Sequence, residues 1–147
     1  MAVVDETPEC ERAMRYAGMR AKNSNGGLVL VYVIQPGDFQ HWLGVEEIMR
    51  AEAMEEAEAT IAKAAEKMRQ IIGIDPETCI RQGQTTEEIH SVIEEDQDIA
   101  ILVLAAGSAK DGPGPLVSSI AGRGAAFPIP VTVIPDALSD EEIDALT

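Results

Sequence analysis

The stretch that decides the fold is Leu28-Val29-Leu30-Val31-Tyr32-Val33-Ile34, residues 28–34, which ends at Gln35-Pro36-Gly37. It is a continuous run of apolar and β-branched residues, a composition typical of strands. Because no polar residue alternates with the apolar ones, the strand is predicted to be buried on both faces, as in parallel sheets covered by helices. The flanking sequence should therefore supply those helices.

Four further segments have the composition of strands. Met1–Val4 and Ile99–Leu104 are apolar runs, whereas Thr78–Gln82 is shorter and more polar. The last segment, Pro128–Pro135, contains several prolines, which lack the N–H group that a central strand needs, so it is predicted at an edge or an interface. Strands and helices alternate along the chain, which predicts an α/β fold: a five-stranded, doubly wound parallel sheet with helices on both faces.

The predicted helices are recognised by their ends and by their apolar spacing. Thr7 and Pro8 suit the start of the first helix, which Gly26 or Gly27 is expected to close. The sequence Thr85-Thr86-Glu87-Glu88 has the Thr-x-x-Glu pattern of a capping box and predicts a helix from about Thr86 to Glu95. A short helix is expected at about 116–126. A long amphipathic helix, acidic on its exposed side, is predicted from Val45 to about Ile72, with apolar residues at Met54, Ala57, Ile61, Ala64, Met68 and Ile71.

Composition limits the partners of the chain. It carries 26 Asp and Glu against 11 Lys and Arg, a formal net charge of −15 that repels nucleic-acid phosphates and anionic lipid headgroups. We therefore expect neither nucleic acid nor a membrane as a partner. No apolar run reaches the roughly 20 residues of a membrane helix, and no basic region precedes an apolar stretch at the N-terminus, so a cytoplasmic protein is expected. Cys10 and Cys79 are expected to be reduced thiols.

The chain has a size typical of one domain. At 147 residues it can bury a core without metals or disulfides. We expect one domain over residues 1–135 and an acidic tail over residues 136–147. In this tail, Ser139-x-x-Glu142 can cap one turn of helix, and a frayed terminus is the alternative.

The candidate site lies at the carboxyl ends of the strands, where doubly wound sheets bind ligands at the point at which strand order reverses. The loop after Leu104 is rich in glycine, which lets backbone N–H groups approach an anion, and a lysine in it supplies a counter-charge. The loop can equally be a tight turn that serves only the helix after it. The residues of this candidate anion site are Gly107, Lys110, Gly112, Gly114, Ser118 and Ser119.

Asp5 follows the first predicted strand and is a second candidate. A carboxylate at this place accepts hydrogen bonds from a ribose hydroxyl or an adenine amino group in dinucleotide folds. The alternative is an acid that only assists the N-terminus of the first helix.

Three features together resemble the universal stress protein family: the start Val3-Val4-Asp5-Glu6-Thr7-Pro8-Glu9, the small-residue loop after a buried fourth strand, and the closing Pro-Val-Thr-Val-Ile at residues 130–134. The resemblance runs from Val3 to Pro135. It implies an α/β fold, ATP binding as in many members, and a dimer joined through the last strand. The dimer interface that it implies consists of Val131, Thr132, Val133 and Ile134.

The family's ATP-binding pattern is Gly-x-x-Gly, nine residues, then Gly-Ser or Gly-Thr. Its first glycine falls on Gly107, the second on Lys110, and the closing pair on Ser118-Ser119, after a stretch that is two residues shorter and contains Pro113 and Pro115. The resemblance implies ATP, with Mg²⁺, as a ligand. It places adenine on Asp5 and the backbone of Val33, ribose on Gly107, and phosphates on Ser118, Ser119 and Ile120.

The leading hypothesis is a stress-response module that binds ATP or a related anion and passes on that state by dimer or partner contacts. The alternative is a dimeric interaction module without a ligand, and a third reading is a slow ATP hydrolase. The sequence has no Ser-His-Asp spacing, metal-ligand cluster or phosphate-binding loop of the Gly-x-x-x-x-Gly-Lys-Ser type, so neither catalysis nor a metal is expected. His41, in the segment Phe39–Trp42, is expected in an apolar flap, and His90 at the exposed side or edge of the third helix.

Overall fold

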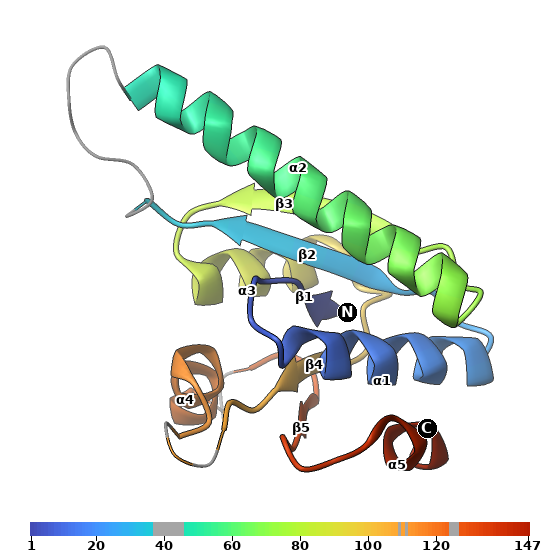
Figure 1. Ribbon diagram of the computed structural model, residues 1–147. Coiled ribbons are helices and arrows are strands. Elements are labelled where there is room, and N and C mark those ends of the chain that lie inside the picture. Colours follow the sequence, from blue (N-terminus) through green and yellow to red (C-terminus); the bar gives the residue numbers. More distant parts are fainter. Residues whose placement is uncertain (37–45, 109, 111, 124–126) are drawn as a thin grey trace.

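The computed structural model describes residues 1–36, 46–108, 110, 112–123 and 127–147 (Figure 1). In these ranges strands and helices alternate along the chain. The strands are β1 (Ala2–Val3), β2 (Val29–Ile34), β3 (Glu77–Gln82), β4 (Leu102–Ala105) and β5 (Val131–Ile134). The helices are α1 (Cys10–Asn23), α2 (Glu46–Ile71), α3 (Thr85–Glu95), α4 (Pro115–Gly122) and α5 (Asp140–Ala145).

The strands form one five-stranded sheet in the order β3-β2-β1-β4-β5, and every neighbouring pair is parallel. Helices α1, α2 and α5 cover one face, and α3 and α4 cover the other (Figure 1). This confirms the predicted doubly wound α/β fold. Strand β5 lies at an edge, as its flanking prolines predict.

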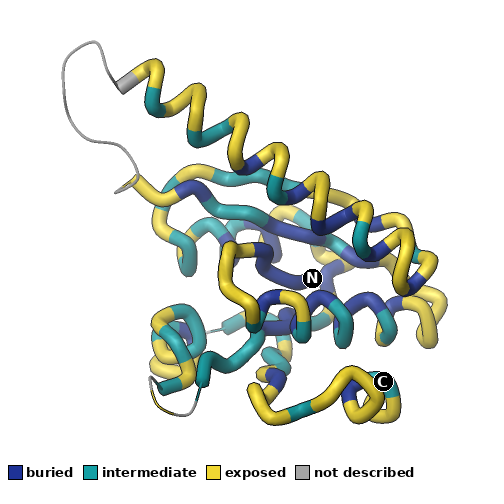
Figure 2. Tube along the Cα trace, viewed as in Figure 1, coloured by how far each residue is buried: buried dark blue, intermediate teal, exposed yellow. Residues whose placement is uncertain are grey.

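Strand β2 contributes to both halves of the core. Leu28 and Leu30 belong to the cluster under α1 and α2, whereas Val29 and Val31 belong to the cluster under α3. Successive side chains of a strand point to opposite faces, so a strand buried on both faces must be apolar throughout. Figure 2 shows this burial along the centre of the sheet.

Helix α1 ends differently from the expectation. Asn25, rather than Gly26 or Gly27, takes the left-handed conformation, with φ of 54°. The N–H groups of Asn25 and Gly26 donate to the carbonyls of Lys22 and Ala21 at 3.2 and 2.8 Å. Asparagine tolerates this conformation, so it completes the Schellman closure without glycine.

Helix α2 buries one stripe and exposes acids. Ala57, Ile61 and Met68 are buried as predicted, but Ile71 is 50% exposed, whereas Ile72 is 3% exposed. The prediction for Ile71 was therefore wrong by one residue, because the buried stripe continues from Met68 by four residues. The predicted first residue of this helix, Val45, and the segment Phe39–Trp42 with His41 lie outside the described residues.

The acidic tail forms a docked helix. Ser139 and Glu142 make a reciprocal capping box at the start of α5, which agrees with the capped turn and not with a frayed terminus. Ile143 is fully buried against the core cluster of α1. Arg15 of α1 donates from Nε and Nη2 to the two carboxylate oxygens of Asp144, at 2.7 and 2.6 Å.

Helix α4 is shorter than expected. It ends at Gly122, and Arg123 is its C-cap. Glycine is a poor helix former, which accounts for the early end, and residues 124–126 lie outside the described part. Among the helices that the structure describes, none is long and apolar enough to cross a membrane.

Candidate functional site

The strand order reverses between β1 and β4. From β1 the chain moves outward through β2 and β3, and it then crosses back to β4 and β5. Helix α1 follows β1 on one face of the sheet, and α4 follows β4 on the other face. The two connections therefore leave the sheet in opposite directions and open a cleft at its carboxyl edge.

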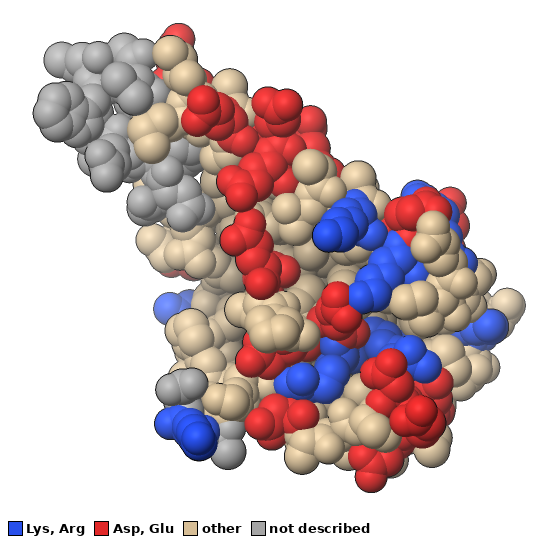
Figure 3. All heavy atoms as spheres, in the orientation of Figure 1, with Lys and Arg blue, Asp and Glu red and all other residues tan. Residues whose placement is uncertain are grey.

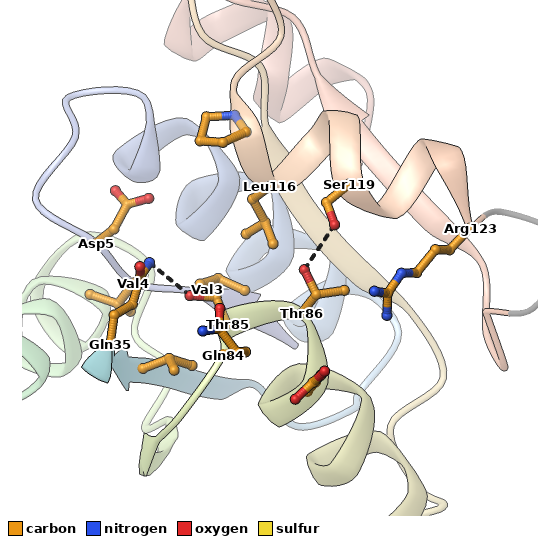
Figure 4. Close-up of a pocket in the computed structure, with 13 residues that line it drawn as sticks. Val3, Val4, Asp5, Gln35, Gln84, Thr85, Thr86, Leu116, Ser119 and Arg123 are labelled. Atoms are coloured by element: carbon orange, nitrogen blue, oxygen red, sulfur yellow. Dashed lines mark hydrogen bonds between the residues drawn. The ribbon is translucent and has the colours of Figure 1, made fainter. Parts of the chain in front are cut away.

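Three adjoining cavities occupy this cleft, and Asp5 lines all of them. The α3–α4 cavity, of about 460 Å³, lies between the start of α3 and helix α4 (Figure 4). The glycine-loop cavity, of about 310 Å³, lies between the start of α1 and the glycine loop, by which we mean the described residues 107, 108, 110 and 112–114. The α2 cavity, of about 520 Å³, lies between the end of β2 and helix α2.

Asp5 is exposed in the cleft and is held in place by Thr7. The backbone N–H and the hydroxyl of Thr7 both donate to Oδ1 of Asp5. The prediction that Thr7 caps α1 was therefore wrong: the N-cap is Glu9, and Pro8 precedes the helix. Thr7 stands two residues before this N-cap, and the bond that its hydroxyl makes goes to Asp5. Among the described residues, both bonds use Oδ1, which leaves Oδ2 for a ligand.

Val33 presents backbone groups to the same cleft. The N–H of Val4 donates to the carbonyl of Val31 at 2.7 Å, so the main-chain groups of Val31 face β1. The N–H and C=O groups of successive residues in a strand point to alternate sides, so the groups of Val33, two residues after Val31, also face the side of β1. Because β1 ends at Val3, no strand lies beside Val33 there in the described part of the sheet. Its N–H and C=O are therefore directed into the cleft.

The glycine loop is folded on itself. The N–H of Gly107 donates to the carbonyl of Pro113 at 3.3 Å. A Cβ atom at Gly107 would lie 3.1 Å from the carbonyl oxygen of Gly112, so the loop needs glycine at this close approach. Gly114, with φ of 92°, is the N-cap of α4, and Pro115 is its first residue. This loop lines the glycine-loop cavity through Gly107, Gly112 and Gly114.

Other predicted phosphate ligands are placed elsewhere. Among the described residues, Lys110, Ser118 and Ile120 line none of the three cavities. Lys110 and Ser118 are exposed, and Ile120 is buried under α4. Ser119 does line the α3–α4 cavity. Helical periodicity explains the difference between the two serines, because residues three or four apart share a face. That face is formed by Leu116, Ser119 and Arg123.

Sequence reasoning missed several polar residues of the α3–α4 cavity. Thr85 was assigned to a capping box, but the N-cap of α3 is Gln84, without a side-chain cap bond. The hydroxyls of both threonines make other contacts: Gln35 Nε2 donates to Thr85 Oγ1 at 2.9 Å, and Thr86 Oγ1 lies 3.1 Å from Ser119 Oγ. One sequence signal could have indicated this group: Gln35 directly follows strand β2, at the carboxyl edge of the sheet. The missed polar residues are Gln35, Gln84, Thr85, Thr86, Glu87 and Arg123.

Groups with reactive chemistry are few around the cleft. The thiol of Cys10 lines the glycine-loop cavity, and burial raises its pKa to about 11, which keeps it neutral. His90 lies half-buried on α3, edge-on to Phe127 with ring centroids 5.9 Å apart. Within the described ranges, no group of three or more His, Cys, Asp and Glu residues could hold a metal ion.

The last strand presents one apolar edge. Val133 is 40% exposed, and Val131 and Thr132 are half-buried. Ile134 is only 3% exposed and packs in the core of its own chain, so its side chain is not at the edge surface. Val131 and Val133 also line an apolar groove of about 310 Å³ beside α4 and Phe127.

Comparisons with known proteins identify the family. The profile of the universal stress protein family matches residues 1–135. A search of the curated proteins found no match. Among solved structures, the hypothetical protein MJ0577 superposes with a TM-score of 0.75 at 16% identity, over 94% of this chain and 97% of that chain.

Two further structures carry the family name. The universal stress protein UspA from Lactobacillus plantarum gives a TM-score of 0.64 at 20% identity, over 91% of this chain and 97% of that chain. A universal stress protein in complex with cAMP gives a TM-score of 0.53 at 20% identity, over 91% of this chain and 94% of that chain. These likenesses show the shared fold. Because the family profile spans residues 1–135 of the 147, the chain belongs to the universal stress protein family.

Proposed function

We propose that this protein is a stress-response module that binds an adenine nucleotide and acts by binding and not by turnover. The observation that carries the proposal is the shared position of Asp5 and Val33 at the open end of β1. Both line the α3–α4 cavity, whose volume of about 460 Å³ suits a small molecule.

The groups at this end of the cleft match a nucleoside. The N–H and C=O of Val33 offer one donor and one acceptor, which complement a ring nitrogen and the amino group of adenine. The carboxylate of Asp5 accepts hydrogen bonds from ribose hydroxyls. Val3, Val33 and Leu116 add apolar surface for the base. The structural neighbour in complex with cAMP supports a nucleotide as the class of ligand.

Asp5→Asn is expected to weaken the binding of AMP by about tenfold, because hydrogen bonds to a charged group are stronger than those to an amide. Asparagine keeps an oxygen that can accept the bonds from Thr7, so the local turn is retained. Isothermal titration measures the affinity. The matched control is Glu6→Gln, the neighbouring exposed acid, which should change it by less than about twofold. Failure of the native protein to bind adenosine, AMP or ATP would overturn the proposed function.

We also propose that the protein forms a dimer through β5, which would transmit the bound state to a second subunit. An apolar strand with an open edge invites pairing with another chain. The exposed side chain of Val133 and the adjoining apolar groove provide the surface for it. If no nucleotide binds, this dimer remains as the second candidate function, a pure interaction module.

Val133→Lys is expected to convert the dimer to a monomer, because pairing would bring two lysines into an apolar contact. Val133→Thr, which keeps the branched shape, is the control and should remain dimeric. Sedimentation velocity distinguishes the species. A native monomer, or a lysine variant that still sediments as a dimer, would show that the edge of β5 is not the interface.

A further inference from the structure

We infer that the cleft selects its nucleotide by charge: it takes a nucleoside with a single phosphate, received by Arg123, Ser119 and Thr86 in the α3–α4 cavity, and discriminates against the triphosphate. The inference rests on the proposed function and deepens it. Three observations carry it: the charge of the cavity walls, the closed glycine loop, and the geometry of the polar cluster around Arg123.

The walls of the cleft are strongly acidic. Six carboxylates line the three cavities, and Arg123 is the one Lys or Arg among the described residues that does so. Figure 3 shows carboxylates along α2, and the whole chain has a net charge of −15. Each additional phosphate therefore adds repulsion that one guanidinium cannot offset. The six carboxylates belong to Asp5, Glu6, Glu9, Glu52, Glu56 and Glu87.

The glycine loop offers few donors to further phosphates. The N–H of Gly107 is already bound to Pro113. Pro115, as the first residue of α4, has no N–H, so that helix lacks one of its free terminal donors. Lys110 is exposed and does not line the cavities. Binding of a triphosphate along the glycine loop would need an open loop and a lysine beside the phosphates. The described residues of this loop supply neither.

The α3–α4 cavity has a compact polar cluster instead. Ser119 and Thr86 lie 3.1 Å apart and join α4 to α3 by a hydrogen bond. Arg123 lies four residues after Ser119 and therefore on the same face of α4. Among the described residues, no carboxylate lies within ion-pair distance of Arg123, so its charge is available to a ligand.

The cluster lies at the opposite end of the α3–α4 cavity from Asp5. Figure 4 shows Asp5 at one end and Arg123 at the other, with Leu116 between them. A nucleoside seated on Asp5 and Val33 would thus direct its phosphate toward the hydroxyls and the guanidinium. Charge-assisted bonds of this kind are the strong ones in phosphate recognition.

Isothermal titration of the native protein with adenosine, AMP, ATP and ATP plus Mg²⁺ tests the selection. At low ionic strength, AMP is expected to bind at least about tenfold more tightly than ATP. Added salt should narrow this difference, because it screens the repulsion of the additional phosphates.

Arg123→Gln identifies the phosphate subsite. It is expected to weaken AMP binding by about tenfold and to leave adenosine binding unchanged, because only the phosphate contacts the guanidinium. The matched control is Lys110→Gln, which should change neither affinity. Thermal unfolding of both variants verifies that they are folded, and both positions are exposed.

The outcomes separate this inference from the proposed function. If ATP binds as tightly as AMP or more tightly, the selection by charge is wrong, but nucleotide binding stands. If Lys110→Gln weakens AMP and Arg123→Gln does not, the phosphate lies on the glycine loop and the assigned subsite is wrong. If neither adenosine nor any nucleotide binds, both proposals are overturned.

Discussion

Ile89→Ala is expected to lower the free energy of unfolding by about 2–5 kcal/mol, the range for truncation of a large buried aliphatic side chain. Ile89 is fully buried on α3 and packs in the cluster that contains Val31 and Leu102. The truncation would leave a cavity between α3 and the sheet. Both strands are hydrogen-bonded on two sides, so they cannot collapse to fill it.

Urea unfolding followed by circular dichroism measures the loss. The matched control is Ile71→Ala, the same change at the end of α2, where the side chain is 50% exposed and the expected loss is below about 1 kcal/mol. An unchanged dependence on urea would show that the variants unfold from equally compact states. Equal losses in the two variants would contradict the packing of α3 on the sheet.

The fold was predicted well because its strongest signals are local. The run 28–34 must be buried on both faces whatever its neighbours are, and the glycine and proline loops mark the ends of most elements. The errors concern side chains with more than one partner available. Thr7 and Thr85 each bind a neighbour from the cleft rather than a helix end. A short sequence pattern cannot predict which partner a hydroxyl binds, because the partner depends on which strand ends lie nearby in the folded chain.

The candidate site was predicted only in part, again because its lining depends on segments that are distant in the sequence. Asp5 and Gly107 follow from topology, since each lies just after a strand that flanks the reversal point, whereas Val33 was named only through the family resemblance. Lys110 was included as the counter-charge for an anion in the glycine-rich loop, but it lines none of the three cavities. Arg123 belongs to no motif, and only helical spacing from Ser119 indicates its position on the cavity face of α4.

The buried thiol of Cys10 is expected to make the fold sensitive to alkaline pH. Its side chain is 5% exposed and lies between the N–H of Asp5 and the carbonyl of Val3, with its sulfur 3.5 Å from each. Burial raises the pKa of this thiol from 9.0 to about 11, and the negative charge of Asp5 acts in the same direction, against a backbone hydrogen bond that lowers it. The folded protein thus keeps the thiol neutral at a pH where the unfolded chain ionises it.

The sign of the pH effect follows from this difference. The stabilisation is fully present below about pH 9 and is lost as the pH rises to about 11, the range between the two pKa values. The loss should reach about 3 kcal/mol. To isolate it, urea unfolding is measured across this range for Cys79→Ala, which leaves Cys10 as the remaining thiol, and for the double variant with Cys10→Ala. The two stability curves should converge or cross as the pH rises. Parallel curves would mean that the thiolate is accommodated beside Asp5, and hence that this wall of the cleft is open to water.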